Sequence, residues 1–247
     1  MPVRYESRGN VALISIERPD RRNAINLETA ELLGDAWLRF DSDEEACLGI
    51  LTGAGGVFSS GADLKDFDLV DRPEGFLGFT RMTVSKPTIA AVEGYCVAGG
   101  LEMALWCDLR VAGEGAVFGC FERRFGVPLV DGGTQRLPRL VGLSRAMDLV
   151  LTGRPVDAGE ALRIGLADRV VPDGTAVAAA LELAATIAAF PQPTVRSDRM
   201  AMLEGLGRPL AEGLEIERLH GLGVLDLAAE GSERFEKGAG RHGGGLV

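Results

Sequence analysis

Short apolar runs separated by polar segments mark the first half of the chain. Residues 3–19 contain two such runs on either side of Gly9-Asn10, a dipeptide typical of the tight turn between paired strands. Three further runs, the first of which ends at a glycine, predict buried strands at residues 46–53, 87–94 and 109–115. Because we expect helical segments between these strands, the pattern favours an α/β fold whose strands are largely parallel.

The segment between residues 19 and 46 has the period of an α-helix instead. Its apolar residues Leu33, Ala36, Trp37 and Phe40 recur at helical spacing and predict a stripe that faces the core. Asn26 precedes the stripe and is the predicted N-cap, because its side chain can accept a hydrogen bond from a free N–H of the first turn.

Helical patterns dominate beyond residue 130. Ser144 is predicted to cap a helix that stops at Gly153, because hydroxyl side chains favour helix starts and glycine favours helix ends. Asp157 and Glu160 have the spacing of a capping box, and Gly165 follows where that second helix should end.

The last part of the chain is predicted to be almost entirely helical. Residues 166–172 form the last short strand of the pattern, and the proline-containing segment 190–194 is the best candidate for a hinge. We expect the glycine-rich end, residues 238–247, to be loosely ordered. The predicted domains are therefore an α/β core at residues 1–190 and a helical C-terminal region at residues 191–247.

Composition and charge narrow the classes of partner. Hydrophobic residues make up 46% of the 247 residues and charged residues 25%, as in ordinary globular proteins. The net charge of −10 and the pI near 4.8 leave no basic footprint, so we expect no nucleic-acid partner. The four cysteines lack CxxC spacing and predict buried free thiols in a reducing compartment. Without a leader pattern or a long apolar run, we expect no membrane association and a cytoplasmic location.

Several common chemistries lack their motifs in this sequence. The two histidines, His220 and His242, both lie in the C-terminal region, and no G-x-S-x-G elbow, P-loop or metal-ligand cluster accompanies them. The segment GAGGVFSSGA faintly resembles a dinucleotide-binding turn, but its third glycine position is occupied by Phe58. The remaining candidates are glycine-rich turns, whose backbone can bind a ligand, and carboxylates.

The segment VAGGLEMALWCD, residues 97–108, combines these two features. It predicts an apolar helix that starts at two glycines and carries one acid, Glu102, in its first turn. The free N–H groups and the dipole of a helix start favour an anion, and glycine lets a ligand approach the backbone closely. Glu102 follows Gly99 by three positions, so both lie on one helical face. We expect the helix end to stabilise ionised Glu102, which is also a sufficient structural reason for an acid there.

Longer motifs identify a family. The segments FSSGADLKDF (58–67) and AAVEGYCVAGGLEMALWCDLRVA (90–112) resemble the signature of the enoyl-CoA hydratase/isomerase superfamily, which has the crotonase fold. The block at 118–171, the N-terminal ERPDRRNAINLETAELL and the late segment EGSERFEKG are similar to the same family in order and spacing. The resemblance covers nearly the whole chain, and several blocks in sequence are far more specific than one.

The resemblance implies a spiral of ββα units with a helical C-terminal region that assembles homotrimers or dimers of trimers. It also implies acyl-CoA thioester substrates, with no metal and no redox cofactor, since coenzyme A is part of the substrate. By the same resemblance, the N–H groups of Ala62 and Gly99 hold a thioester enolate, and the catalytic glutamates are Glu102 and Glu122. The implied contacts to coenzyme A are Arg22, Ala24, Asp63, Leu64 and Lys65, together with Ala62 and Gly99. The resemblance gives weaker support to two further contacts, Phe235 and Lys237.

Two acidic residues keep structural alternatives. Glu122 lies in FERRF, where Arg123 or Arg124 could pair with it on a solvated surface. Asp131 precedes a predicted helix, so an N-cap is its ordinary explanation, although the resemblance places it next to a position where some relatives carry a catalytic carboxylate. Many hydratases have a small residue there, and this difference leaves the reaction type open. The loop between Lys65 and Lys86 should line the acyl pocket.

The leading hypothesis is an enoyl-CoA hydratase that converts a trans-2-enoyl-CoA to a 3-hydroxyacyl-CoA, because both Glu102 and Glu122 are present. The nearest alternative is another crotonase reaction such as double-bond isomerisation, which needs only one base. A non-catalytic acyl-CoA binder is an alternative of another class, and a nicotinamide oxidoreductase is a third.

Overall fold

A computed structural model of the protein describes residues 1–236. The chain divides into two compact units, of which the first is Met1–Ala184 and the second begins at Ala185. The sequence places its domain boundary at residue 190, a few residues later, and that domain assignment stays a prediction. The predicted features at Lys237, His242 and the glycine-rich end lie outside the described residues.

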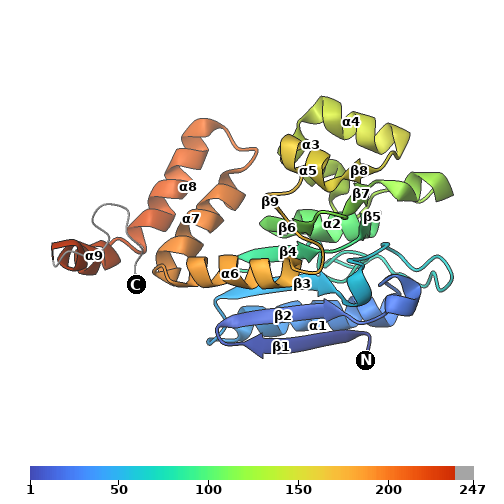
Figure 1. Ribbon diagram of the computed structural model, residues 1–247. Coiled ribbons are helices and arrows are strands. Elements are labelled where there is room, and N and C mark those ends of the chain that lie inside the picture. The colour runs from blue at the N-terminus through green and yellow to red at the C-terminus, as the bar shows by residue number, and fades with distance from the viewer. Residues whose placement is uncertain (237–247) are drawn as a thin grey trace. The chain divides into compact units, whose positions relative to one another are not determined.

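A six-stranded sheet forms the framework of the first unit (Figure 1). The first two strands form an antiparallel hairpin around Gly9-Asn10, and every other pairing in this sheet is parallel, as the apolar runs predict. All residues of the second and fourth strands are buried, which explains why they are continuous apolar runs in the sequence. In spatial order the strands are β1 (Val3–Arg8), β2 (Val11–Ile16), β3 (Leu48–Gly53), β4 (Thr88–Val92), β6 (Leu109–Gly113) and β9 (Arg169–Val171).

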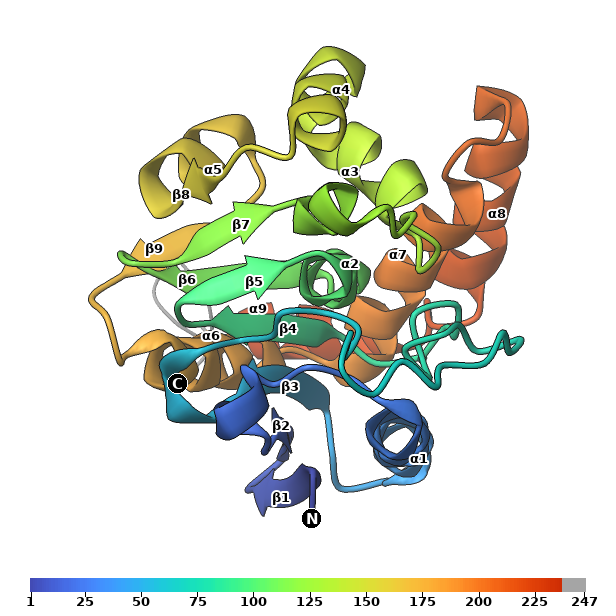
Figure 2. The ribbon, with the colours of Figure 1, turned by 90° about the vertical axis from the view of Figure 1, so that its right-hand side faces the viewer.

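A smaller sheet lies beside this framework and was not predicted from the sequence. It contains β5 (Tyr95–Val97), β7 (Val117–Gly119) and β8 (Val156–Asp157), where β5 and β7 are parallel. The chain therefore alternates between the two sheets, from β4 to β5, then to β6 and to β7. Helix α2 (Gly99–Trp106) starts directly after β5, so its first turn is held where the two sheets meet (Figure 2).

The first long helix confirms the prediction from hydrophobic spacing. Helix α1 (Leu27–Ser42) packs on β1 and β2, and the side chain of Asn26 accepts a hydrogen bond from the N–H of Thr29 as its N-cap. The predicted stripe is buried, and its Trp37 ring contacts Phe79 and Trp106 at centroid distances of 5.6 and 4.7 Å. This aromatic cluster joins α1, α2 and the segment between β3 and β4.

That segment between β3 and β4 contradicts the expectation of a helix between strands. Only the short 3₁₀ helix η2 (Ala54–Gly56) occurs at its start, and residues 57–87 contain no helix. Side-chain bonds to α1 hold it instead: Asp68 accepts from the N–H of Leu27 at 2.8 Å, and Arg72 pairs with Glu31 at 2.7 Å. Tertiary contacts, which a local pattern does not reveal, therefore determine the path of this segment.

Three helices and a 3₁₀ helix follow β7 within the first unit. The predicted cap at Ser144 is wrong, because Gly142 precedes the helix and Ser144 lies inside its first turn. Asp157 does cap the third helix by accepting from the N–H of Glu160, while the Glu160 carboxylate pairs with Arg154. These elements are η3 (Phe121–Phe125), α3 (Gly133–Val141), α4 (Leu143–Thr152) and α5 (Ala158–Ile164).

The remaining described residues are helical, as the sequence predicts. Helix α6 (Ala176–Ala188) is followed by α7 (Gln192–Gly205), α8 (Leu210–Leu222) and α9 (Leu227–Glu236). Helices α7 and α8 pack against each other within the second unit. No single helix within residues 1–236 has the length and apolar character needed to cross a membrane. Among these residues, only helices α6 and α7 taken together have that length and apolar character, and the pair is sharply bent.

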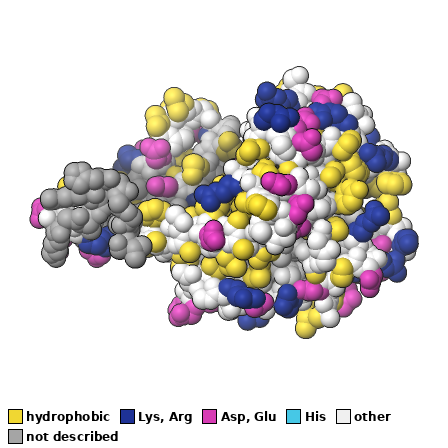
Figure 3. Space-filling view, in the orientation of Figure 1, with side chains coloured by type: hydrophobic (Ala, Val, Ile, Leu, Met, Phe, Trp, Pro, Cys, Tyr) yellow, Lys and Arg dark blue, Asp and Glu magenta, His cyan; other side chains and the backbone are white. Residues whose placement is uncertain are grey.

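Acidic and basic side chains are interspersed on the molecular face drawn in Figure 3. Lysine and arginine do not gather there into a continuous stripe of the kind that follows a nucleic-acid backbone.

Candidate active site

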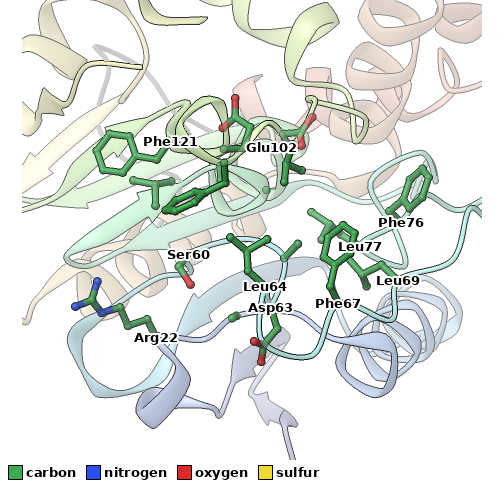
Figure 4. A pocket seen from close by; sticks show the side chains of 18 of the residues that line it. Arg22, Ser60, Asp63, Leu64, Phe67, Leu69, Phe76, Leu77, Glu102 and Phe121 are labelled. Atoms are coloured by element: carbon green, nitrogen blue, oxygen red, sulfur yellow. The ribbon is translucent and has the colours of Figure 1, made fainter. Parts of the chain in front are cut away.

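One cavity of about 740 Å³ brings together the residues that the sequence singled out. Its lining comes from five separate stretches of the first unit, and Figure 4 shows Glu102 and Phe121 on one side of it with Leu64 and Leu77 opposite. The implied catalytic residues, the more strongly supported contacts to coenzyme A and the open candidate Asp131 all contribute to the lining: Arg22, Ala24, Ala62, Asp63, Leu64, Lys65, Gly99, Glu102, Glu122 and Asp131.

The N–H group of Ala62 is turned toward the cavity by the backbone around it. The carbonyl of Gly61 accepts a hydrogen bond from the N–H of Ile25 at 2.8 Å. Because the C=O and N–H of a trans peptide point in opposite directions, the Ala62 N–H points away from Ile25. Ala62 itself lines the cavity, so its N–H is available to a bound group.

The N–H group of Gly99 is presented by the start of α2. The carbonyl of Ala98 accepts the hydrogen bond from Glu102 N at 3.2 Å, so the Gly99 N–H of the same peptide points out of the helix end. The positive end of the helix dipole lies at this point. Gly99 therefore offers a second donor to a group in the cavity.

These two donors lie close together because Gly61 has no side chain. A Cβ atom at Gly61 would lie 2.5 Å from the nitrogen of Gly99, closer than atoms can approach. Gly61 also has a φ of +83°, in the left-handed region that favours glycine. Glycine at this position is thus required both by the turn and by the approach of the two loops.

Ala98 has an unusual backbone conformation that aims the second donor. Its φ of 54° and ψ of −128° are rare for a residue with a Cβ. The N–H of Ala98 donates to the carbonyl of Gly119 in β7 at 2.9 Å, which helps to hold this conformation. Strain of this kind typically costs about 1–3 kcal/mol and is found where the local geometry serves a site.

Glu102 is a buried acid held by one of its two carboxylate oxygens. Its exposed fraction is 3%, and its Oε1 accepts from the N–H groups of Asp131 and Gly133 at 2.9 and 2.8 Å. Neither amide donates to Oε2, so that oxygen is the one available for proton transfer in the cavity.

Burial raises the pKa of Glu102 to about 7, even though the Gly133 amide lowers it. The negative charges of Asp131 and Glu122 add to the rise. The helix end was expected to stabilise ionised Glu102, but the net effect of the surroundings favours the neutral acid, because the loss of hydration on burial is the largest cause of the shift. An acid with a pKa near neutrality can both take up and release a proton under physiological conditions.

Glu122 faces Glu102 from the 3₁₀ helix η3. It is 5% exposed, and neither of its carboxylate oxygens has a hydrogen-bond partner within the described residues. Burial raises its pKa above the usual range. The surface ion-pair alternative is wrong, because Arg123 and Arg124 instead donate to the carbonyls of Val150 and Gly153.

Asp131 is buried and does not cap the helix that follows it. Gly132 precedes α3, and the Asp131 carboxylate accepts from the N–H of Leu77 at 3.2 Å and from the hydroxyl of Thr80. The N-cap explanation is therefore wrong. Sequence reasoning missed these two partners because they lie more than fifty positions away along the chain.

The charged side of the cavity has one structural carboxylate and several exposed cations. Asp63 is buried and pairs with Arg18 at 3.0 Å, so its side chain holds the loop in place. Arg18 was not singled out from the sequence, although it lies in the segment ERPDRRNAINLETAELL that carries part of the family resemblance. Arg22 lies over the Tyr95 ring at 5.7 Å and is exposed, as is Lys65, so both can reach a phosphate.

Apolar side chains line the rest of the cavity. The loop between Lys65 and Lys86 contributes to this wall, as the sequence analysis expected. The opposite part of the wall comes from η3 and the segment after it, which the sequence analysis did not identify as lining. The apolar lining includes Val97, Phe125, Val127, Pro128 and Val130. It also includes Leu64, Phe67, Leu69, Phe76, Leu77 and Phe121, which Figure 4 labels.

Known proteins match this chain over most of its length. A family model described as enoyl-CoA hydratase/isomerase matches residues 6–221. A probable enoyl-CoA hydratase of Rhizobium meliloti is 41% identical over 86% of this chain and 85% of its own length. Enoyl-CoA hydratase EchA19 of Mycobacterium tuberculosis is 38% identical over 93% and 91%. The crystal structure of enoyl-CoA hydratase EchA1 from Mycobacterium marinum superposes with a TM-score of 0.92 at 36% identity, covering 96% of both chains.

Proposed function

This chain belongs to the enoyl-CoA hydratase/isomerase family and has its crotonase fold, and on this premise we propose that it is an enoyl-CoA hydratase. The reaction adds water across the C2=C3 double bond of a trans-2-enoyl-CoA and yields a 3-hydroxyacyl-CoA. Attack at C3 pushes an electron pair onto the thioester oxygen, and the resulting enolate then takes a proton at C2. No metal or redox cofactor enters this chemistry, since acids, bases and hydrogen-bond donors suffice.

The N–H groups of Ala62 and Gly99 bind the thioester oxygen in this proposal. Both face one cavity, and the contact between Gly61 and Gly99 keeps them near each other. Donors that are already oriented stabilise the developing negative charge without reorganising during the reaction. Loss of one such donor typically costs about 2.7–4 kcal/mol of transition-state stabilisation.

Glu102 and Glu122 hold and activate the water. Glu102, with a pKa of about 7, takes a proton from the water as its oxygen bonds to C3. Glu122, whose pKa is raised by burial, gives its proton to C2. The proton on Glu102 then returns to Glu122 through solvent, which restores both groups and balances the addition of one water.

The single observation that carries this proposal is the unpartnered, buried carboxyl of Glu122 in the same cavity as Glu102. A buried polar group without a partner is costly, and a bound water or substrate atom would satisfy it. Double-bond isomerisation runs on one base and gives no reason to retain a second buried acid. A pair of acids is what water addition needs.

The test follows the conjugated thioester of crotonyl-CoA by its ultraviolet absorbance. We expect the wild-type protein to bleach this absorbance, and Glu122→Gln to lower kcat/KM by roughly 100- to 10,000-fold while CoA affinity stays unchanged. Glu44→Gln, an exposed substitution of the same kind, serves as the control and should keep wild-type activity. A flat wild-type trace across enoyl-CoA substrates of different chain length would contradict the hydratase proposal.

The alternatives give different results in the same assays. An isomerase would convert 3-enoyl-CoA to 2-enoyl-CoA and would leave crotonyl-CoA unhydrated. A non-catalytic binder would bind CoA equally well with Glu122→Gln and would turn over no enoyl thioester. A nicotinamide oxidoreductase would bind NAD, which a titration measures directly.

The coenzyme A part of the substrate would lie along the charged side of the cavity. Arg22 and Lys65 are placed to meet its phosphates, and the backbone of Ala24, Asp63 and Leu64 would contact its pantetheine and adenine groups. Charge attraction between these cations and a polyanionic ligand offsets the acidic net charge of −10.

Assembly and location complete the proposal. Helices α7 and α8 and the turn between them expose Met202, Leu206, Leu210 and Leu214, which supports their burial in a homotrimer or dimer of trimers. Light scattering after gel filtration would measure the mass of the assembly. The four cysteines are free thiols, which supports a reducing compartment such as the cytoplasm.

A further inference from the structure

A third buried carboxylate, Asp131, adjoins the two glutamates, and the proposed reaction does not use it. It is 2% exposed and lies on the segment between η3 and α3. Its Oδ1 accepts from the N–H of Leu77 at 3.2 Å and from the hydroxyl of Thr80. Both partners lie within residues 57–87, which contain no helix or strand. The carboxylate thus fixes a turn that local structure leaves unsupported.

The main chain of Asp131 makes a second set of bonds. Its N–H donates to Oε1 of Glu102 at 2.9 Å. Its carbonyl accepts from Nη1 of Arg136 at 2.9 Å, while Nη2 of Arg136 donates to the carbonyl of Thr80 at 2.6 Å. Arg136 therefore joins the two segments that the Asp131 carboxylate also joins. Glu102, Asp131, Arg136 and Thr80 form one connected network of hydrogen bonds.

The network also reaches the proposed donor at Gly99. A Cβ atom at Gly99 would lie 2.9 Å from Cδ1 of Leu77, so the Leu77 side chain packs directly on this glycine. The Leu77 backbone is held by Asp131. One residue thereby connects the carboxylate oxygen of Glu102 with the apolar side chain that packs on Gly99.

We propose that Asp131 is a positioning residue, which fixes Glu102 through its own amide and Leu77 through its carboxylate. The proposal rests on the hydratase function proposed above, and it assigns Asp131 no contact with the substrate. The negative charge of the carboxylate also disfavours ionisation of Glu102, so Asp131 contributes to proton uptake by Glu102 as well as to its position.

Charged and titratable groups face Glu102 from each neighbouring element. Asp131 and Glu122 raise its pKa by their negative charge, from the segment before α3 and from η3. Arg136 of α3 faces it with a positive charge, and the Cys120 thiol lies on the side of β7. Burial is the largest cause of the raised pKa, so removal of the Asp131 charge should lower the pKa and leave it above that of an exposed glutamate.

Two substitutions separate the charge from the hydrogen bonds. Asp131→Asn keeps an oxygen that can accept from Leu77 and Thr80 but removes the charge. Asp131→Ala removes both. Asp35→Asn removes one negative charge from the exposed face of α1 and is the matched control.

The first measurement is the pH dependence of kcat/KM, in which ionisation of Glu102 gives the acidic limb. Asp131→Asn should move this limb to lower pH relative to both the wild type and Asp35→Asn. Asp131→Ala should in addition lower kcat on the order of 100-fold, because a catalytic group displaced by an ångström loses about that factor. A purely structural Asp131 would lower the melting temperature without moving the limb.

The second measurement does not depend on turnover. In protein labelled with ¹³C at glutamate carboxyl groups, the Glu102 resonance is assigned by its loss in Glu102→Gln and is titrated without substrate. A lower titration midpoint in Asp131→Asn than in the wild type and in Asp35→Asn supports the proposal. An unchanged midpoint together with an unchanged acidic limb overturns it. If the wild type hydrates no enoyl thioester but the midpoint still moves, the hydratase function fails and the influence of Asp131 on Glu102 stands.

Discussion

Glu102→Gln should make the folded protein more stable at pH 8 while it abolishes the proton transfer proposed for this residue. In the folded state the pKa of Glu102 is about 7, against 4.5 for an unperturbed glutamate. Between those two values the folded protein binds more protons than the unfolded chain, so its free energy of unfolding falls as pH rises. The carboxylate at pH 8 therefore destabilises the fold, and the neutral amide of glutamine does not.

The size of the effect follows from the same two values, 4.5 and about 7. Each unit of pKa corresponds to about 1.4 kcal/mol, so the raised pKa of Glu102 lowers the free energy of unfolding by about 3 kcal/mol at pH 8 and by about 1 kcal/mol at pH 5. Oε1 of the new side chain can still accept from the Asp131 and Gly133 amides, which preserves the local packing. Any constant difference between acid and amide is the same at both pH values and cancels in the comparison.

Thermal unfolding at pH 5 and pH 8 measures this difference. For a chain of this size, the stabilisation by Glu102→Gln should grow by roughly 4–8 °C in melting temperature between the two pH values. Glu44→Gln, which changes an exposed glutamate, should give the same small shift at both. If the advantage of Glu102→Gln is equal at pH 5 and pH 8, Glu102 has an ordinary pKa and the burial argument for its proton transfer is refuted.

Two further substitutions test the proposed binding groups. Gly61→Ala should lower kcat on the order of 100-fold, because its Cβ would press on the Gly99 nitrogen. The control Gly56→Ala should keep kcat, because Gly56 also has a positive φ but has open space around it. Steady-state kinetics that show equal losses in the two variants would contradict the paired-donor geometry. Arg22→Gln should weaken CoA binding, measured by calorimetry, on the order of 10-fold in dilute buffer and by less in high salt. A loss of affinity that does not depend on salt would contradict a contact between Arg22 and a phosphate.

The sequence predicted those elements whose burial leaves a recognisable pattern of apolar residues along the chain. The apolar runs of β2, β3 and β4 and the helical stripe of α1 appear in the structure as expected, because burial of one face or both faces leaves a periodic trace. The small sheet was missed because β5, β7 and β8 are three residues or shorter. The segment 57–87 was misjudged because bonds to α1 determine its path.

The site was predictable in its residues and not in its energetics. Motif resemblance supplied Ala62, Gly99, Glu102 and Glu122, and all four line one cavity. The raised pKa of Glu102 was not predictable, because it depends on burial and on charges brought from distant segments. The same holds for the backbone strain at Ala98, which no residue type signals.

Buried charged groups outside the cavity give the comparison that makes Glu122 informative. Arg110 is fully buried, and its guanidinium donates to the carbonyls of Leu166 and Cys107 and to the Asp168 carboxylate. Its charge is matched by partners, as the cost of burying ions requires. Glu122 is also buried, with an exposed fraction of 5%, yet both of its oxygens lack a protein partner within the described residues. The same fold that satisfies Arg110 completely could have paired or replaced this acid. An unpaired acid beside a pair of preoriented amides is therefore best explained by a partner that arrives with the substrate.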